Sequence, residues 1–249
     1  TAVLLASGAT SVAAQPIHQN GTLNRAAYDI RVPAAWNGTL IVIAHGYRER
    51  ANGPFDVPDT SAPTASGGDQ EGLAVGLMSQ GYAVASSAYA NNGWAVKEGI
   101  QNTGALTEFF NVQVATPVRT ILLGFSMGTV VAFKSLERDD APYDAAVCGC
   151  AVGAGSSLNW DFATTILLAY DVAFGIPPSW GTVSDLRDDL DFQTEVFPVL
   201  LAQATNPANI GKFEFIRLVT GAPLAGFYSG PNWLFTDMFF ATEGRAELE

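Results

Sequence analysis

Residues Gly124 to Gly128, Gly-Phe-Ser-Met-Gly, place one serine between two glycines. A short apolar run of strand type, residues 119–123, precedes them, and residues 129–138 follow with helical spacing. In a sharp strand-to-helix turn, a side chain at either glycine position would clash with neighbouring elements. The serine hydroxyl then projects at the carboxyl edge of the sheet, beside helix N–H groups that favour negative charge. We predict that Ser126 is a nucleophile; the alternative is an ordinary turn with an incidental serine.

A second motif, Ala44-His45-Gly46-Tyr47, directly follows an apolar strand-like run that begins at Thr39. With both motifs, residues 25–155 resemble the α/β-hydrolase superfamily, specifically secreted bacterial esterases and lipases with a helical lid. The resemblance implies an oxyanion hole made by the backbone N–H groups of Tyr47 and Met127, each typically worth about 3 kcal/mol in the transition state. It also implies supporting roles for four further residues. These are His45, Gly46, Gly124 and Gly128.

The histidines do not complete a catalytic triad. The sequence has only His18 and His45, and both precede Ser126, whereas the superfamily order is nucleophile, acid, histidine. We therefore predict a structural role for His45 in holding the oxyanion loop, and a surface position for His18. A serine nucleophile needs a base whose pKa is near neutrality.

Three explanations of the missing base remain open. The first is that the chain is a fragment, with the acid and the histidine further along or on a second polypeptide. The second is a degenerate hydrolase that binds without turnover, and the third is an unusual base. The acid candidates within the chain are weak, because solvated helix faces explain most of them. They are Asp161, Asp171, Asp185, Asp188, Asp189, Asp191 and Asp237.

The order of elements positions these motifs. Five strand-like segments alternate with helical ones, which favours an α/β fold with an open, mostly parallel sheet flanked by helices. The strands are expected at 25–33, 39–46, 82–90, 119–124 and 143–153. Since the superfamily sheet usually has eight strands, the C-terminal part of the fold is expected to be missing. We predict an α/β-hydrolase core at residues 1–155 and a helical lid or cap at 156–249.

The predicted lid has helical spacing at 162–174, 194–205 and 212–221 and is rich in aromatic residues. Its aromatic side chains either line an acyl or aryl pocket or form the lid's own core. They are Trp160, Trp180, Phe227, Tyr228 and Trp233. If they line a pocket, the substrate is a hydrophobic acyl or aryl ester, including fragments of polyesters.

Composition narrows the choice of partners. The chain has 249 residues, is 48% hydrophobic, and carries a net charge of −12, so we expect it to be repelled by nucleic acid and anionic membranes. No run of 18 apolar residues predicts a membrane span. The scarcity of lysine and a faint signal-like start suggest secretion, although residues 1–14 fit an interrupted first strand better. We predict no cofactor and no metal.

The two cysteines, Cys148 and Cys150, are expected to be small buried hydrophobes of a core strand. The function predicted from these patterns is ester cleavage through an acyl-enzyme on Ser126. A serine peptidase of the same fold is one alternative, with Arg48 and Arg50 as the nearby charges for a peptide terminus. A non-catalytic binding protein of this fold is the other.

Overall fold

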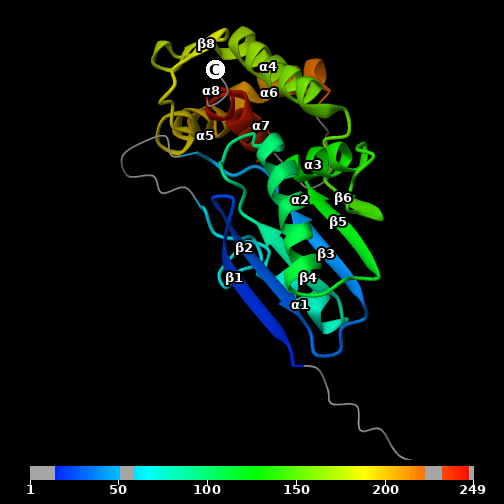
Figure 1. The fold of residues 1–249 in the computed structure, drawn as a ribbon. Helices are drawn as coiled ribbons and strands as arrows, with labels where there is room; N and C mark the ends of the chain where they lie inside the picture. Colours follow the sequence, from blue (N-terminus) through cyan, green and yellow to red (C-terminus); the bar gives the residue numbers. More distant parts are fainter. Residues whose placement is uncertain (1–14, 51–58, 222–231, 247–249) are drawn as a thin grey trace, which may run out of the picture. The chain divides into compact units, whose positions relative to one another are not determined.

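The computed structural model describes residues 15–50, 59–221 and 232–246. The chain forms two compact units, each described here by itself (Figure 1). The sheet unit comprises the residues up to His45, Thr60–Ala90 and Lys97–Gly149. The helical unit comprises Gly46–Asp59, Asn91–Val96 and the residues from Cys150 onward. The expected fold class, a mostly parallel sheet flanked by helices, is confirmed in the sheet unit.

The sheet has six strands in the order β1-β2-β4-β3-β5-β6. Strands β3, β4, β5 and β6 run parallel to one another, and β2 joins β4 in an antiparallel pair. The strands are β1 (Ile17–Leu23), β2 (Ala26–Val32), β3 (Thr39–Ala44), β4 (Ala83–Ser87), β5 (Arg119–Phe125) and β6 (Ala145–Gly149). Because parallel strands end at one edge of a sheet, the residues after β3, β4, β5 and β6 share the carboxyl edge.

Strand β1 is the element that the sequence did not predict. Its residues are mostly exposed on both faces, so the sequence shows no apolar alternation there. It pairs with β2 from Ile17 opposite Val32 to Leu23 opposite Ala26. Asn24 and Arg25 join the two strands with φ angles of 49° and 68°, the conformation that a tight two-residue hairpin requires.

Helices cover both faces of this sheet. Helix α1 (Glu71–Ser79) packs through Ala74 on the face that includes Ile41 and Val84. Helix α2 (Val96–Gln113) lies on the opposite face, where the ring of its Phe109 is 5.4 Å from the ring of Tyr28 in β2. Helix α3 (Met127–Leu136) packs beside α2. Burial on both faces explains why the strand β3 is a continuous apolar run.

The helical unit has its own core around two stacked rings. Tyr170 and Trp180 lie 5.7 Å apart, and both are fully buried. The longer helices are α4 (Gly155–Phe174), α5 (Phe197–Ala204), α6 (Ile210–Thr220) and α7 (Asn232–Ala241). Shorter elements are a π-helix (Phe192–Val196), helix α8 (Glu243–Ala246) and a ribbon of β7 (Gly181–Thr182) with β8 (Asp185–Leu186). The three predicted helical stretches fall in α4, in the π-helix with α5, and in α6.

The prediction that both cysteines are buried core residues is wrong. Cys148 is only half-buried, and Cys150 is exposed with a φ angle of 53°. The reason is that β6 is the last strand of the described sheet and pairs only with β5. Val147, on the same strand, is 55% exposed, so an apolar run here marks a strand at the edge of the sheet.

In the described part of the chain, no helix combines the length and apolar character needed to cross a membrane. The same residues contain no cluster of three or more histidine, cysteine, aspartate or glutamate side chains placed to hold a metal ion. Residues 1–14, where a cut first strand was predicted, lie outside the described residues.

Candidate active site

Ser126 stands in the sharp turn between β5 and α3 and has a strained backbone. Its φ and ψ angles are 50° and −121°, a region that costs a residue with a side chain about 1–3 kcal/mol. Hydrogen bonds on both sides hold the turn. The Ser126 N–H donates to the Gly149 carbonyl at 3.1 Å, and the Thr129 N–H donates to the Ser126 carbonyl at 2.9 Å. The serine side chain is partly exposed, so its hydroxyl is accessible at the carboxyl edge.

Two close backbone approaches explain both glycines of the motif. A Cβ atom at Gly124 would lie 2.4 Å from the Gly128 carbonyl oxygen. A Cβ atom at Gly128 would lie 2.1 Å from the Ala44 carbonyl oxygen and 2.7 Å from that of His45. These oxygens belong to main chain that the sheet fixes, so a side chain at either position has nowhere to go. The two motifs singled out in the sequence therefore meet through the backbone.

Met127 is the first residue of α3, and its side chain is fully buried. The N–H groups of a first helical turn have no partner within the helix, so the Met127 N–H is available to an oxyanion beside Ser126. Tyr47 belongs to the helical unit, where its ring lies 5.5 Å from the ring of Phe240. The oxyanion roles of Tyr47 and Met127 remain predictions, as does that of Gly46.

His45 is buried at the end of β3 and stacks on Tyr89, with ring centroids 3.8 Å apart. The Tyr89 hydroxyl donates to the His45 carbonyl at 3.3 Å. That carbonyl is one of the oxygens that Gly128 approaches. Tyr89, which the sequence did not single out, therefore helps to fix the backbone beside the nucleophile. This arrangement fits the structural role predicted for His45, with ring stacking as the main contact.

His18 lies in strand β1, and its side chain is 52% exposed. Its Nε2 is 2.7 Å from Oδ1 of Asp29, a fully buried carboxylate. The other Asp29 oxygen accepts from Arg31 Nε at 2.8 Å and from Thr64 Oγ1 at 2.9 Å. Four strand positions separate β1 from β5, about 19 Å across the sheet. His18 therefore holds a buried structural carboxylate and cannot be the base for Ser126.

Most of the candidate acids have local structural tasks. Asp171 accepts from the Ile176 N–H at 2.9 Å, and Asp191 caps the π-helix by accepting from the Thr194 N–H at 2.7 Å. Asp189 pairs with Arg187. Asp237, in α7, differs because burial raises its pKa to about 6. None of these observations makes any of them the partner of a catalytic histidine.

The aromatic residues of the helical unit divide into two groups. Trp180 belongs to the unit's core. Trp160 lies against Trp94, with centroids 5.2 Å apart, and against Phe240 at 6.2 Å. Phe240 also contacts Tyr47, so these rings join α4 and α7 to the loop after β3 within one unit. Phe227 and Tyr228, and the side chain of Trp233, lie outside the described residues.

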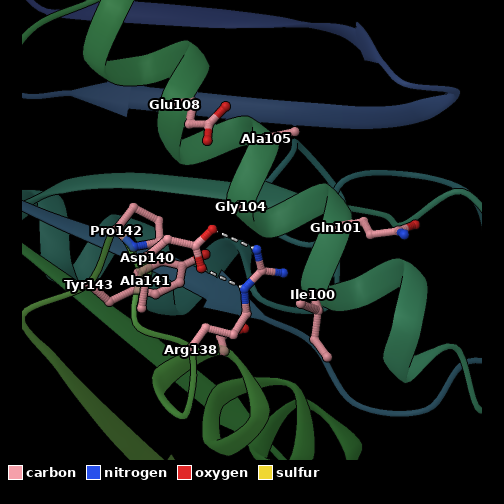
Figure 2. Close-up of a pocket in the computed structure, with 11 residues that line it drawn as sticks. Ile100, Gln101, Gly104, Ala105, Glu108, Arg138, Asp140, Ala141, Pro142 and Tyr143 are labelled. Carbon is pink, nitrogen blue, oxygen red and sulfur yellow. Dashed lines mark hydrogen bonds and ion pairs between the residues drawn. The ribbon is translucent and has the colours of Figure 1, made fainter.

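A pocket of about 270 Å³ lies between α2 and the end of α3 (Figure 2). Arg138 spans it and makes a paired hydrogen bond with Asp140 at 2.9 and 3.0 Å. Helix α3 starts beside Ser126 and is about 15 Å long. Its far end, and Tyr143 before β6, therefore lie towards the amino edge of the sheet. This pocket does not serve the nucleophile.

No family model matches the sequence, and no curated protein matches it either. Solved structures do resemble it. An esterase of Pyrococcus furiosus is 12% identical over 64% of this chain and 55% of its own, with a TM-score of 0.42. A carboxyl esterase of Bacillus coagulans is 11% identical over 90% and 73%, with a TM-score of 0.43. A proline iminopeptidase-related protein of Thermus thermophilus is 18% identical over 94% and 72%, with a TM-score of 0.43.

The chain spans about half the length of two of the matched structures, 51% of a putative hydrolase from Agrobacterium vitis and 55% of the Pyrococcus esterase. An epoxide hydrolase, CorEH, is also among the matches, with a TM-score of 0.37. Likenesses this remote assign no family to the chain. The description of its site rests on the chain's own geometry, a strained serine between two glycines that the surrounding backbone requires.

Proposed function

We propose that this chain carries the nucleophile half of a serine hydrolase that cleaves carboxylic esters. Ser126 attacks the ester carbonyl, the N–H groups of Met127 and Tyr47 stabilise the oxyanion, and water releases the acyl group. The observation that carries the proposal is the φ angle of 50° at Ser126. An incidental serine gains nothing from a strained backbone, whereas a nucleophile gains an exposed hydroxyl at the amino end of a helix.

The base and the acid come from outside these 249 residues, either further along the polypeptide or on a second one. His18 is about 19 Å across the sheet from β5, and the His45 ring is buried against Tyr89. A donated histidine must approach the carboxyl edge, where Ser126 follows β5. We further propose that the helical unit acts as a lid and that its aromatic rings favour hydrophobic acyl or aryl esters.

The peptidase alternative gains little support from the two arginines of the loop after β3. Arg48 lies 3.5 Å from the Asp59 carboxylate, and Arg50 donates to the Asn92 carbonyl at 3.3 Å. Both cations are thus engaged within the helical unit. The binding-protein alternative requires that Ser126 never reacts, and it is tested directly by a serine-directed probe.

The test is labelling with a fluorophosphonate followed by peptide mapping, with Ser126→Ala as the control. The purified chain is tested alone and with imidazole at roughly 0.1–0.5 M as a surrogate base, concentrations on the order of those that weak general bases need. We expect label on Ser126, faster with imidazole, and none on the variant. A folded chain that stays unlabelled under both conditions would refute the nucleophile.

The substrate class is tested separately on a preparation that takes the label. Initial rates with p-nitrophenyl acetate, octanoate and benzoate are compared under the same imidazole concentration. A preference for the octanoate or the benzoate supports a hydrophobic acyl or aryl substrate. Equal rates on all three would sink that assignment while leaving the nucleophile intact.

A further inference from the structure

A second cavity, of about 600 Å³, lies wholly within the sheet unit. Three elements form this hairpin pocket, namely the β1–β2 turn, a residue of the loop after β4, and the first turns of α2. Its lining residues are Asn24, Arg25, Ala90, Lys97, Glu98, Gln101 and Asn102. Strand β2 runs antiparallel to β4, so the start of β2 and the end of β4 meet at the carboxyl edge. The hairpin pocket therefore opens at the edge that carries Ser126.

The cations of this pocket are unusual in the molecule. Nine of the twelve lysine and arginine side chains are held by a carboxylate, a carbonyl or an aromatic ring. These are Arg31, Arg48, Arg50, Lys134, Arg138, Arg187, Lys212, Arg217 and Arg245. Among the described residues, Arg25 and Lys97 have no such partner, and both line the hairpin pocket. Arg119, at the start of β5, is the third unheld cation and lies at the opposite edge.

A buried amide points to a ligand independently of the charges. Asn102 is only 6% exposed, and its Oδ1 accepts from the Ala90 N–H at 2.9 Å. Its Nδ2 donates to no described residue, although the side chain lines the hairpin pocket. The first turn of α2 adds N–H groups that favour an anion. Glu98 offsets one of the two cations, which leaves a net charge of +1 on the lining.

We propose that the hairpin pocket binds the carboxylate or phosphate group of a small organic anion, with Arg25, Lys97 and the Asn102 amide as its donors. Charge-assisted hydrogen bonds to such oxyanions are the strongest available to these side chains. A polyanion is not the ligand, because a chain of net charge −12 repels it. Two strand positions separate β4 from β5, about 10 Å, so the anion is either part of the substrate or a separate effector.

The experiment is a titration of ¹⁵N-labelled chain with inorganic phosphate and with succinate at low, constant ionic strength, because salt screens exposed cations. Saturable shifts of the Ala90 and Asn102 signals are expected. In Arg25→Ala/Lys97→Ala the affinity should fall about tenfold or more. Asn102→Asp should abolish binding, since it keeps the acceptor for Ala90 but replaces the donor by a negative charge. Arg119→Ala is the matched control and should bind as the parent does.

Shifts that do not saturate, or an equal loss of affinity in Arg119→Ala, would overturn the proposal. Ser126→Ala should bind phosphate normally, so failure of the nucleophile and failure of the anion site are separable. If the bound anion slows fluorophosphonate labelling of Ser126, the site holds part of the substrate. If labelling is unchanged while binding saturates, the same chemistry serves a separate small anion.

Discussion

Replacing Gly128 by alanine tests the geometry of the nucleophile turn most directly. Gly128 is the second residue of α3, and helix propensity alone predicts that alanine would stabilise the chain by about 1 kcal/mol. The structure predicts the opposite sign. The new Cβ would lie 2.1 Å from the Ala44 carbonyl oxygen, and Ala44 is held in register with Gly124 of β5. Relief requires α3 or β3 to move by about 1 Å, and overpacking of this kind costs about 3 kcal/mol.

The assay is urea unfolding followed by circular dichroism, with Gly76→Ala as the matched control. Gly76 lies in α1, and a Cβ there would meet no atom within 4 Å, so that variant should gain up to about 1 kcal/mol. For Gly128→Ala we expect a loss of about 3 kcal/mol and slower labelling of Ser126. Equal stabilisation in both variants would show that the backbone approach at Gly128, and the turn built on it, are wrong.

Three further predictions concern buried charge and strain. Asp29→Ala should destabilise the fold by about 3 kcal/mol, measured by urea unfolding, because it strands Arg31 beside a buried site; a loss below about 1 kcal/mol would contradict this. Burial raises the pKa of Asp237 to about 6, so its charged form destabilises the fold increasingly from about pH 4 to 6 and fully above that. Asp237→Asn should therefore stabilise the chain by about 1 kcal/mol at about pH 8, after allowance for partial exposure, and by nothing at about pH 4, as thermal melts at both pH values would show. Ser126→Gly should be more stable than Ser126→Ala by about 1 kcal/mol, because both lose the hydroxyl but only glycine relieves the positive φ; the reverse order, expected at an unstrained position, would refute strain.

The nucleophile turn was predictable because its constraint is local. Two glycines that flank a serine between a strand and a helix record a backbone that tolerates no side chain there, and the distances at Gly124 and Gly128 agree with this. The buried parallel strands were predictable for a related reason. A strand covered on both faces must be apolar throughout, as β3 is.

Features that depend on what covers an element could not be predicted. Residues 143–153 are as apolar as β3, yet Val147 is 55% exposed because β6 pairs on one side only. Strand β1 failed in the opposite direction, since it is polar and pairs through its backbone. The partnership of His18 with Asp29 links residues on two strands and depends on their register. An apolar or polar pattern reports the average surroundings of a segment but not which neighbour is present.

The strain at Ser126 and the position of the histidines together argue for a shared active site. A residue with a φ angle of 50° costs stability in every folded molecule. Binding alone does not require that cost, because a ligand can be held by unstrained donors such as the Asn102 amide. The strain is useful when the hydroxyl must meet both a base and an oxyanion hole at the sheet's carboxyl edge. Since neither histidine of the chain is placed to reach that edge as a base, we propose that the turn is built for a base supplied from outside these residues.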